Sequence, residues 1–107
     1  ATTMFEIGRL AAARDDGLAP YLEARQLLFR ERFELALPRI IDARQRGLPT
    51  PRMELEARRV EAMIRLGADE PDVSARLWRE VLRDESSGEA ERVEARDWLA
   101  RIRLSGG

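Results

Sequence analysis

A short duplication constrains the fold of this chain more than any other feature of its sequence. The segment Leu22-Glu23-Ala24-Arg25 returns as Leu55-Glu56-Ala57-Arg58, thirty-three residues later. A repeat of about that length is typical of stacked helix pairs when the apolar residues follow the period of an α-helix. The sequence therefore predicts a helical repeat, in which neighbouring pairs cover the apolar faces that one pair leaves open.

Composition narrows the function classes. The 107 residues, one domain's worth of chain, include no His, Cys, Lys or Asn, and all 19 cationic residues are Arg. Without His and Cys there are no disulfides, thiolate nucleophiles, imidazole catalysts or usual zinc ligands. A net charge of −1 without a basic stripe disfavours a nucleic-acid partner. No apolar run spans a membrane and no signal-peptide pattern opens the chain, so we expect no membrane insertion and slightly favour the cytoplasm.

The periodicity predicts six short helices and no strand. We expect the first helix at Met4–Arg14, with Thr3 and Glu6 in a capping box and Gly17 as a left-handed stop. The second helix is expected to begin with Pro20 in its first position, where the missing amide hydrogen is not needed.

The run from Tyr21 to Leu37 contains no Gly or Pro, so periodicity alone also permits one long helix there. The charged residues 30–32 are the place that suits a tight turn, which gives a second helix and a third ending at Arg46. Pro38 falls within the third helix. It is tolerated close to the first turn, and deeper in the helix it would cost about 3 kcal/mol.

Proline and capping residues mark the remaining helices. Thr50 before Pro51 predicts a cap followed by a first helical residue, and Pro71 opens the fifth helix. Ser86 and Glu89 have the spacing of a capping box for the sixth helix. The fourth helix carries a regular apolar stripe and two acid–base pairs at four-residue spacing, Glu54 with Arg58 and Glu61 with Arg65.

The segment 31–43 resembles the second helix of a tetratricopeptide repeat. That helix has an aromatic residue, Ala-Leu, a bulky residue and a further Ala, and here these are Phe33, Ala36, Leu37, Ile40 and Ala43. The family also has a small residue twelve positions before the first Ala, here Ala24, and a closing proline, here Pro49. Proline after Ala-Leu is frequent in bacterial members. The resemblance implies an all-α, right-handed superhelix of antiparallel helix pairs.

A second repeat fits at a different register. Adding 38 to the positions Ala24, Ala36, Ile40 and Ala43 gives Ala62, Ser74, Trp78 and Val81. The duplication gives 33 instead, so the two registers together require an insertion. The expected organisation is an N-terminal helix that caps or remains from a preceding repeat (1–18), two helix pairs (19–50 and 51–84), a capping helix (85–104) and a tail (105–107).

In this family the first helix of each pair lines a groove that binds peptides. The resemblance therefore implies a non-catalytic module of a larger bacterial protein, which binds a protein or peptide segment of acidic character. The candidate contact residues are Tyr21, Arg25, Arg58, Arg59 and Arg65. The alternative for these arginines is a solvated helix face held by acid–base pairs. Members that clamp a terminal carboxylate use Lys and Asn, which this chain lacks.

Other hypotheses stay open beside this one. A structural spacer or self-associating domain, forming a homo-oligomer, would use the apolar faces of the end helices. A helix-turn-helix at 69–104 has a long, acidic link for a DNA-binding motif. We expect Trp78 and Trp98 in the core. Phe29 could contact a ligand at the groove, as Tyr21 could, but packing on the first helix is the favoured interpretation for it. The carboxylates near 15–16 and 69–72 suit caps and loops, so we expect no metal, no cofactor and no enzyme activity.

Overall fold

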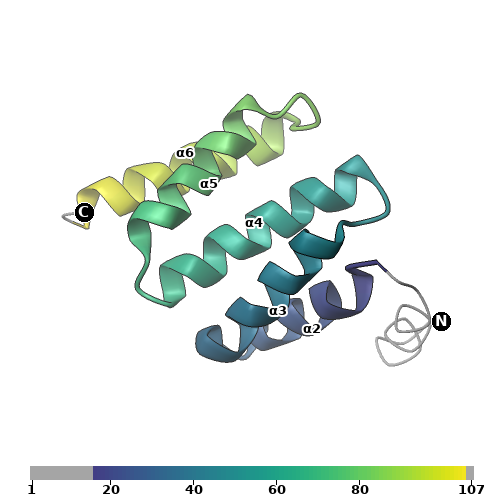
Figure 1. The fold of residues 1–107 in the computed structure, drawn as a ribbon. Coiled ribbons are helices and arrows are strands. Elements are labelled where there is room, and N and C mark those ends of the chain that lie inside the picture. The colour runs from purple at the N-terminus through teal and green to yellow at the C-terminus, as the bar shows by residue number, and fades with distance from the viewer. Residues whose placement is uncertain (1–15, 106–107) are drawn as a thin grey trace.

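The computed structural model describes residues 16–105, which form five α-helices and no strand. The helices are α2 (Leu18–Phe29), α3 (Phe33–Arg46), α4 (Pro51–Gly67), α5 (Pro71–Arg83) and α6 (Glu89–Leu104). Successive helices run in opposite directions, with α2 and α3 on one side of α4 and α5 and α6 on the other (Figure 1). The all-α prediction is confirmed, and the helix expected at Met4–Arg14 lies outside the described residues.

Apolar side chains form two clusters, one on each side of α4. The first is composed of Tyr21, Leu22, Ala24, Ala36, Ile40, Ala43, Ala57, Val60 and Ile64. The second is composed of Leu55, Ala62, Ala75, Leu77, Trp78, Val81, Ala95 and Ile102. Trp78 is fully buried and stacks on the partly buried Trp98, with ring centroids 6.2 Å apart. Because α4 contributes to both clusters, it holds the two ends of the described chain together.

The turn between α2 and α3 has the same backbone pattern as the turn between α4 and α5. Glu31 and Asp69, which are 38 residues apart, have positive φ angles of 57° and 65°. Their amides donate to the carbonyls of Leu28 and Leu66, at 2.9 and 3.1 Å, and these two residues are also 38 apart. The tight turn predicted near residues 30–32 is confirmed, and its geometry recurs once within the described residues.

Both registers hold because α4 is longer than α2. The first residues of these helices, Leu18 and Pro51, are 33 apart, whereas their last residues, Phe29 and Gly67, are 38 apart. The helices contain 12 and 17 residues, so the difference of five equals the difference between the registers. The insertion that the sequence required therefore lies within the helix and not in a loop.

The positions matched at an offset of 38 are among the most buried in the molecule. All eight are 0% exposed: Ala24, Ala36, Ile40, Ala43, Ala62, Ser74, Trp78 and Val81. Small side chains at the first two positions of each set let the paired helices approach closely. In the second pair the Ser74 hydroxyl donates to the Ala62 carbonyl at 2.7 Å, which satisfies the polar group without leaving the interface.

The start of α2 differs from the prediction. The helix begins at Leu18, so Pro20 is its third residue, and the Asp16 carboxylate accepts the Leu18 amide at 3.1 Å. The prediction that Gly17 adopts a left-handed conformation is wrong, since its φ is −84°. A β-carbon at Gly17 would lie 2.0 Å from the Ala43 carbonyl oxygen, so glycine is required by close packing on α3.

At the other helix starts, Thr50 accepts the Met53 amide at 3.1 Å, and Pro51 and Pro71 are first helical residues as predicted. The predicted cap of α6 is wrong. Ser87 donates its hydroxyl to the Val81 carbonyl at 2.6 Å, so the loop folds back on α5 and the cap moves to Gly88.

The Gly88 amide is bonded by the Glu91 carboxylate at 3.1 Å, which replaces the expected Ser86–Glu89 box. Pro38 is the sixth residue of α3, and the helix continues through it to Arg46, with the proline ring exposed. The helix thus tolerates proline beyond its first turn.

Candidate functional site

A hollow between α2 and α4 brings together three of the five predicted contact residues. We call it the α2–α4 groove; its volume is about 420 Å³. It is lined by Tyr21, Arg25, Leu28 and Phe29 of α2 and by Arg52, Glu56, Arg59, Val60 and Met63 of α4. Because α2 and α4 lie against each other, one wall comes from each helix.

Arg25 is the charged residue of the α2 wall. Its guanidinium carbon lies 5.8 Å from the ring centre of Tyr21 and 6.0 Å from that of Phe29. Within residues 16–105 no carboxylate pairs with it, and the two rings hold its charge in place. Tyr21 is 5% exposed, and burial raises the pKa of its phenol.

Phe29 is 76% exposed. The helix on which it was expected to pack lies outside the described residues, so that expectation stays a prediction. An exposed aromatic ring beside a cation is a surface that apolar ligand groups can cover. Phe29 therefore joins the candidate contact residues, which is the alternative that its aromatic side chain near Tyr21 had left open.

The arginines of the α4 wall are already paired. Arg59 donates to Glu56 at 2.7 Å and to Glu94 of α6 at 2.6 Å, and the bond to Glu94 is the main reason why the pKa of Arg59 is raised. Arg52 pairs with the buried Glu91 of α6. These two arginines fasten α4 to α6, so for Arg59 the structure favours the acid–base interpretation over direct ligand contact.

Arg58 and Arg65 do not line the groove. Arg58 donates to Asp84 at 2.9 Å, at the end of α5, and so the predicted pair with Glu54 is wrong. Glu54 instead accepts the amide of Leu48, which precedes α4. The helix geometry allowed the four-residue pair, but a neighbouring helix offered a carboxylate closer to the guanidinium.

The predicted pair between Glu61 and Arg65 is confirmed at 3.0 Å. Glu61 also accepts from Arg44 of α3 at 2.8 Å, and its side chain is only 8% exposed. Arg65 has a further bond to Glu70 at 3.0 Å. This group of charges connects α3, α4 and the start of α5, and it acts in packing.

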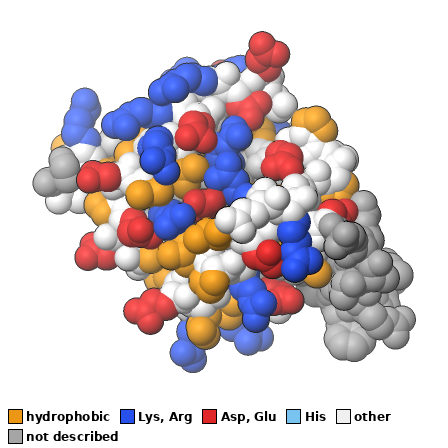
Figure 2. Space-filling model, in the orientation of Figure 1, with side chains coloured by type: hydrophobic (Ala, Val, Ile, Leu, Met, Phe, Trp, Pro, Cys, Tyr) orange, Lys and Arg blue, Asp and Glu red, His pale blue; other side chains and the backbone are white. Residues whose placement is uncertain are grey.

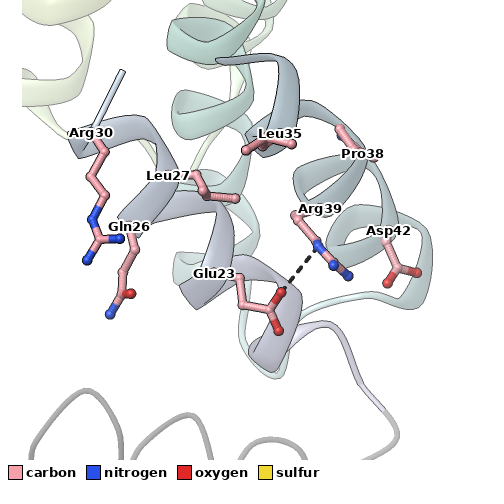
Figure 3. Close-up of a pocket in the computed structure, with 8 residues that line it drawn as sticks. All are labelled: Glu23, Gln26, Leu27, Arg30, Leu35, Pro38, Arg39 and Asp42. Carbon is pink, nitrogen blue, oxygen red and sulfur yellow. Dashed lines mark ion pairs between the residues drawn. The ribbon is translucent and has the colours of Figure 1, made fainter. Parts of the chain in front are cut away.

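A second hollow, of about 570 Å³, lies between α2 and α3 (Figure 3). Glu23 and Arg39 point toward each other across it, with a nitrogen–oxygen distance of 3.2 Å, and both side chains are 55% exposed. Leu27 and Leu35 supply its apolar part. Its lining holds two acidic and two basic side chains, so its charges balance; Arg30, the arginine there that pairs with no carboxylate among residues 16–105, is exposed to water and not stacked on aromatic rings as Arg25 is.

Sequence reasoning missed a third surface, formed by α5 and α6. Arg79, Arg96 and Arg103 line a hollow of about 520 Å³ between these helices. Basic side chains gather in the part of Figure 2 where Figure 1 shows α5 and α6. Arg96 and Arg103 are seven residues apart and so share one helix face, which was a signal available in the sequence. We call this surface the α5–α6 face.

In comparisons with known proteins, no family model, curated protein or solved structure matches the chain. Among residues 16–105, no three acidic side chains are grouped closely enough to hold a metal ion. In the same part of the chain, no helix combines the length and apolar character needed to cross a membrane.

Proposed function

We propose that this chain is a tetratricopeptide-like helical-repeat module that binds a peptide segment of a partner protein in the α2–α4 groove. The recurrence of one turn and one set of buried positions at an offset of 38 supports a repeat of helix pairs. The groove lies between the first helices of the two pairs, which is where the tetratricopeptide resemblance implies that a ligand binds.

The observation that carries the proposal is the state of Arg25. It is the groove arginine that has no carboxylate partner among residues 16–105, and it is held between the rings of Tyr21 and Phe29. A guanidinium fixed in this way binds a carboxylate through two parallel hydrogen bonds at a small cost in side-chain entropy. The exposed Phe29 ring beside it favours an apolar neighbour in the ligand.

The ligand class that follows is a short segment with an Asp, a Glu or a terminal carboxylate next to an apolar side chain. Arg52 and Arg59 are engaged with Glu91 and Glu94, so they stiffen the opposite wall and contribute little new charge. The contact set is therefore narrower than the sequence suggested: Tyr21, Arg25 and Phe29 act directly, and Arg58 and Arg65 act in packing.

Selection from a random peptide library on the purified protein tests this proposal. Three forms are compared: the wild type, Arg25→Glu and Phe29→Ala, with Arg32→Glu as a control that makes the same charge change at an exposed residue. We expect the wild type and the control to enrich acidic–apolar peptides, and Arg25→Glu to lose about tenfold or more in affinity for them.

Equal affinity of all four forms for the selected peptides would contradict binding in the α2–α4 groove. Enrichment of peptides that contain no acidic residue would contradict it as well. Circular dichroism and thermal unfolding of each variant show whether the loss reflects binding or folding. NMR shift mapping with one selected peptide then locates its contact surface on α2 and α4 or elsewhere.

Self-association is the second candidate, and the exposure of large apolar side chains favours it. Leu35 and Leu104 are 58% and 83% exposed, and they belong to α3 and α6. Light scattering over a wide concentration range separates the two functions. A strict monomer at high concentration excludes the self-association role, whereas a dimer that ignores peptide ligands excludes the groove role.

A further inference from the structure

The α5–α6 face combines exposed arginines with an apolar floor. Arg79 of α5 and Arg96 and Arg103 of α6 are exposed, and none of them pairs with a carboxylate within residues 16–105. The floor between them is formed by Ala75, Leu99, Ala100 and Ile102. One carboxylate, Asp72, lies in the lining, so the face carries a positive excess.

The rest of the molecule shows what normally covers such a surface. Arg44 of α3 pairs with Glu61 of α4 at 2.8 Å, and Arg58 of α4 pairs with Asp84 at the end of α5 at 2.9 Å. In both cases an arginine on one helix meets a carboxylate supplied by the helix that packs next, while apolar side chains fill the space between the helices.

Arg59 of α4 pairs with Glu94 of α6 at 2.6 Å, so a charge pair also joins two helices that are not consecutive. In the exposed pair between Arg39 of α3 and Glu23 of α2 the carboxylate comes from the preceding helix, and this pair also joins neighbouring helices. Charge pairing across stacked helices is thus a recurring device of this fold. On the α5–α6 face the arginines and the apolar floor are present, but no carboxylate of residues 16–105 pairs with these three arginines.

We propose that the α5–α6 face binds an acidic amphipathic α-helix of a partner protein. The apolar stripe of that helix covers the floor formed by Leu99, Ala100 and Ile102, and its Glu or Asp side chains pair with the three arginines. Arg96 and Arg103 are two helical turns apart, about 10 Å along the axis, so the partner helix carries its carboxylates at a similar spacing. This surface is separate from the α2–α4 groove, and the two proposals fail independently.

An acidic helix fits this face better than a nucleic acid does. A phosphate backbone would satisfy the arginines but leave the partly exposed Leu99 and Ala100 uncovered, and it would meet the Asp72 carboxylate. A helix with an apolar stripe between rows of carboxylates satisfies both parts of the surface, as α4 does for Arg44 and its apolar neighbours.

Fluorescence polarisation with synthetic peptides tests the proposal on the whole chain. The probe is a labelled peptide of about 18 residues, with Leu at helical spacing and Glu on both flanks, which forms a helix of about 27 Å. Its matched forms replace every Glu by Gln or place a proline in the middle. The protein variants are Arg79→Gln/Arg96→Gln/Arg103→Gln and a control, Arg30→Gln/Arg32→Gln/Arg46→Gln, with the same charge change on other exposed arginines.

We expect the Glu peptide to bind the wild type and the control alike, and to bind the α5–α6 triple variant about tenfold more weakly. The Gln form should lose a similar factor, and the proline form should lose binding because it cannot present a continuous helix. Added salt should weaken the Glu peptide.

Equal binding of the Glu peptide to all three proteins would overturn the proposal. So would equal binding of the proline form, or complete displacement by a single-stranded DNA oligonucleotide at equal charge concentration, since either result identifies a general polyanion surface. The substituted arginines are exposed, so we expect both triple variants to remain folded. Circular dichroism checks this.

Discussion

The pairs α2–α3 and α4–α5 are built on the same plan, and they differ in how they are used. Both have the turn with positive φ, at Glu31 and Asp69, and both bury four equivalent side chains completely. The second pair differs in the length of its first helix, because α4 has five more residues than α2 (17 − 12). Side chains of α4 belong to both apolar clusters, so within residues 16–105 the pair α4–α5 has helices packed on both sides, whereas the described contacts of α2–α3 are with α4 alone.

Two equivalent glutamates show the consequence. Glu23 and Glu61 are 38 residues apart, but the side chain of Glu23 is 55% exposed and that of Glu61 is 8% exposed. Among residues 16–105 Glu23 pairs with Arg39 alone, whereas Glu61 pairs with both Arg44 and Arg65. We therefore expect these two equivalent glutamates to contribute differently to the free energy of unfolding, because one is exposed and the other is buried between helices.

The largest expected effect comes from the equivalent core positions Trp78 and Ile40. Both are 0% exposed, and Trp78 also stacks on Trp98. Trp78→Ala should cost about 3–5 kcal/mol and Ile40→Ala about 2–4 kcal/mol, since each leaves a cavity. Denaturant unfolding checks this, with the exposed Leu35→Ala as a control expected within about 0.5 kcal/mol of wild type. A loss of unfolding free energy at Trp78 or Ile40 that is smaller than the loss for Leu35→Ala would contradict the equivalence of these two core positions.

The two glutamates give the next largest contrast. Glu61→Ala should cost about 2–3 kcal/mol, because it leaves two partly buried guanidinium groups without their shared partner. Glu23→Ala should cost less than about 0.5 kcal/mol, as exposed ion pairs do. The comparison uses unfolding free energies at low and high salt. Similar costs for both substitutions would show that their different burial has no energetic consequence.

Acid should weaken the second half of the stack. The Ser86 amide bond lowers the pKa of Asp84, and the Arg52 bond lowers that of Glu91. Groups with a lowered folded pKa stabilise fully above the unfolded values, near 3.9 for Asp and 4.3 for Glu, and this stability is lost as the pH falls through the folded pKa values.

The contribution of Asp84 and Glu91 to the free energy of unfolding should therefore change little between about pH 7 and pH 5. It should decrease when the pH is lowered beyond about 4. Asp84→Asn and Glu91→Gln should lower stability at neutral pH and flatten the acid limb of the profile. An acid limb as steep as that of wild type in the double variant would assign the effect to other carboxylates.

The smallest effect concerns the two equivalent turns. Glu31 and Asp69 have left-handed backbones, which cost a residue with a β-carbon about 1 kcal/mol. Glu31→Gly should stabilise by about 0.5–1 kcal/mol and Asp69→Gly by less, because Asp tolerates this conformation better than Glu. Thermal unfolding at matched pH measures both shifts, with Glu34→Gly inside α3 as a destabilising control. Destabilisation at both turn positions would contradict their assigned geometry.

Local signals predicted most of the helices. Thr50, Pro51 and Pro71 marked helix starts that the structure contains, because caps and prolines act through their immediate neighbours. The matched positions from Ala24 to Val81 were found by type and spacing, and all are buried. The cap of α6 was missed because Ser87 bonds to the end of α5, a contact that spacing along one helix does not reveal.

The candidate site was less predictable, since an arginine's role depends on which carboxylates neighbouring helices supply. Arg25, Arg58 and Arg59 look alike in the sequence, yet Arg58 and Arg59 pair with Asp84 and Glu94, 26 and 35 residues away. Arg25 has no such partner among residues 16–105. Helix periodicity places a side chain on a face but does not say what packs against that face.

Solution NMR tests the helix-pair repeat most directly, through the backbone angles and contacts at the two turns. The repeat predicts positive φ at both Glu31 and Asp69, with close contacts between Ala24 and Ala36 and between Ala62 and Ser74. A continuous helix from Tyr21 to Ala43, with a helical φ at Glu31 and no contact between Ala24 and Ala36, would contradict it.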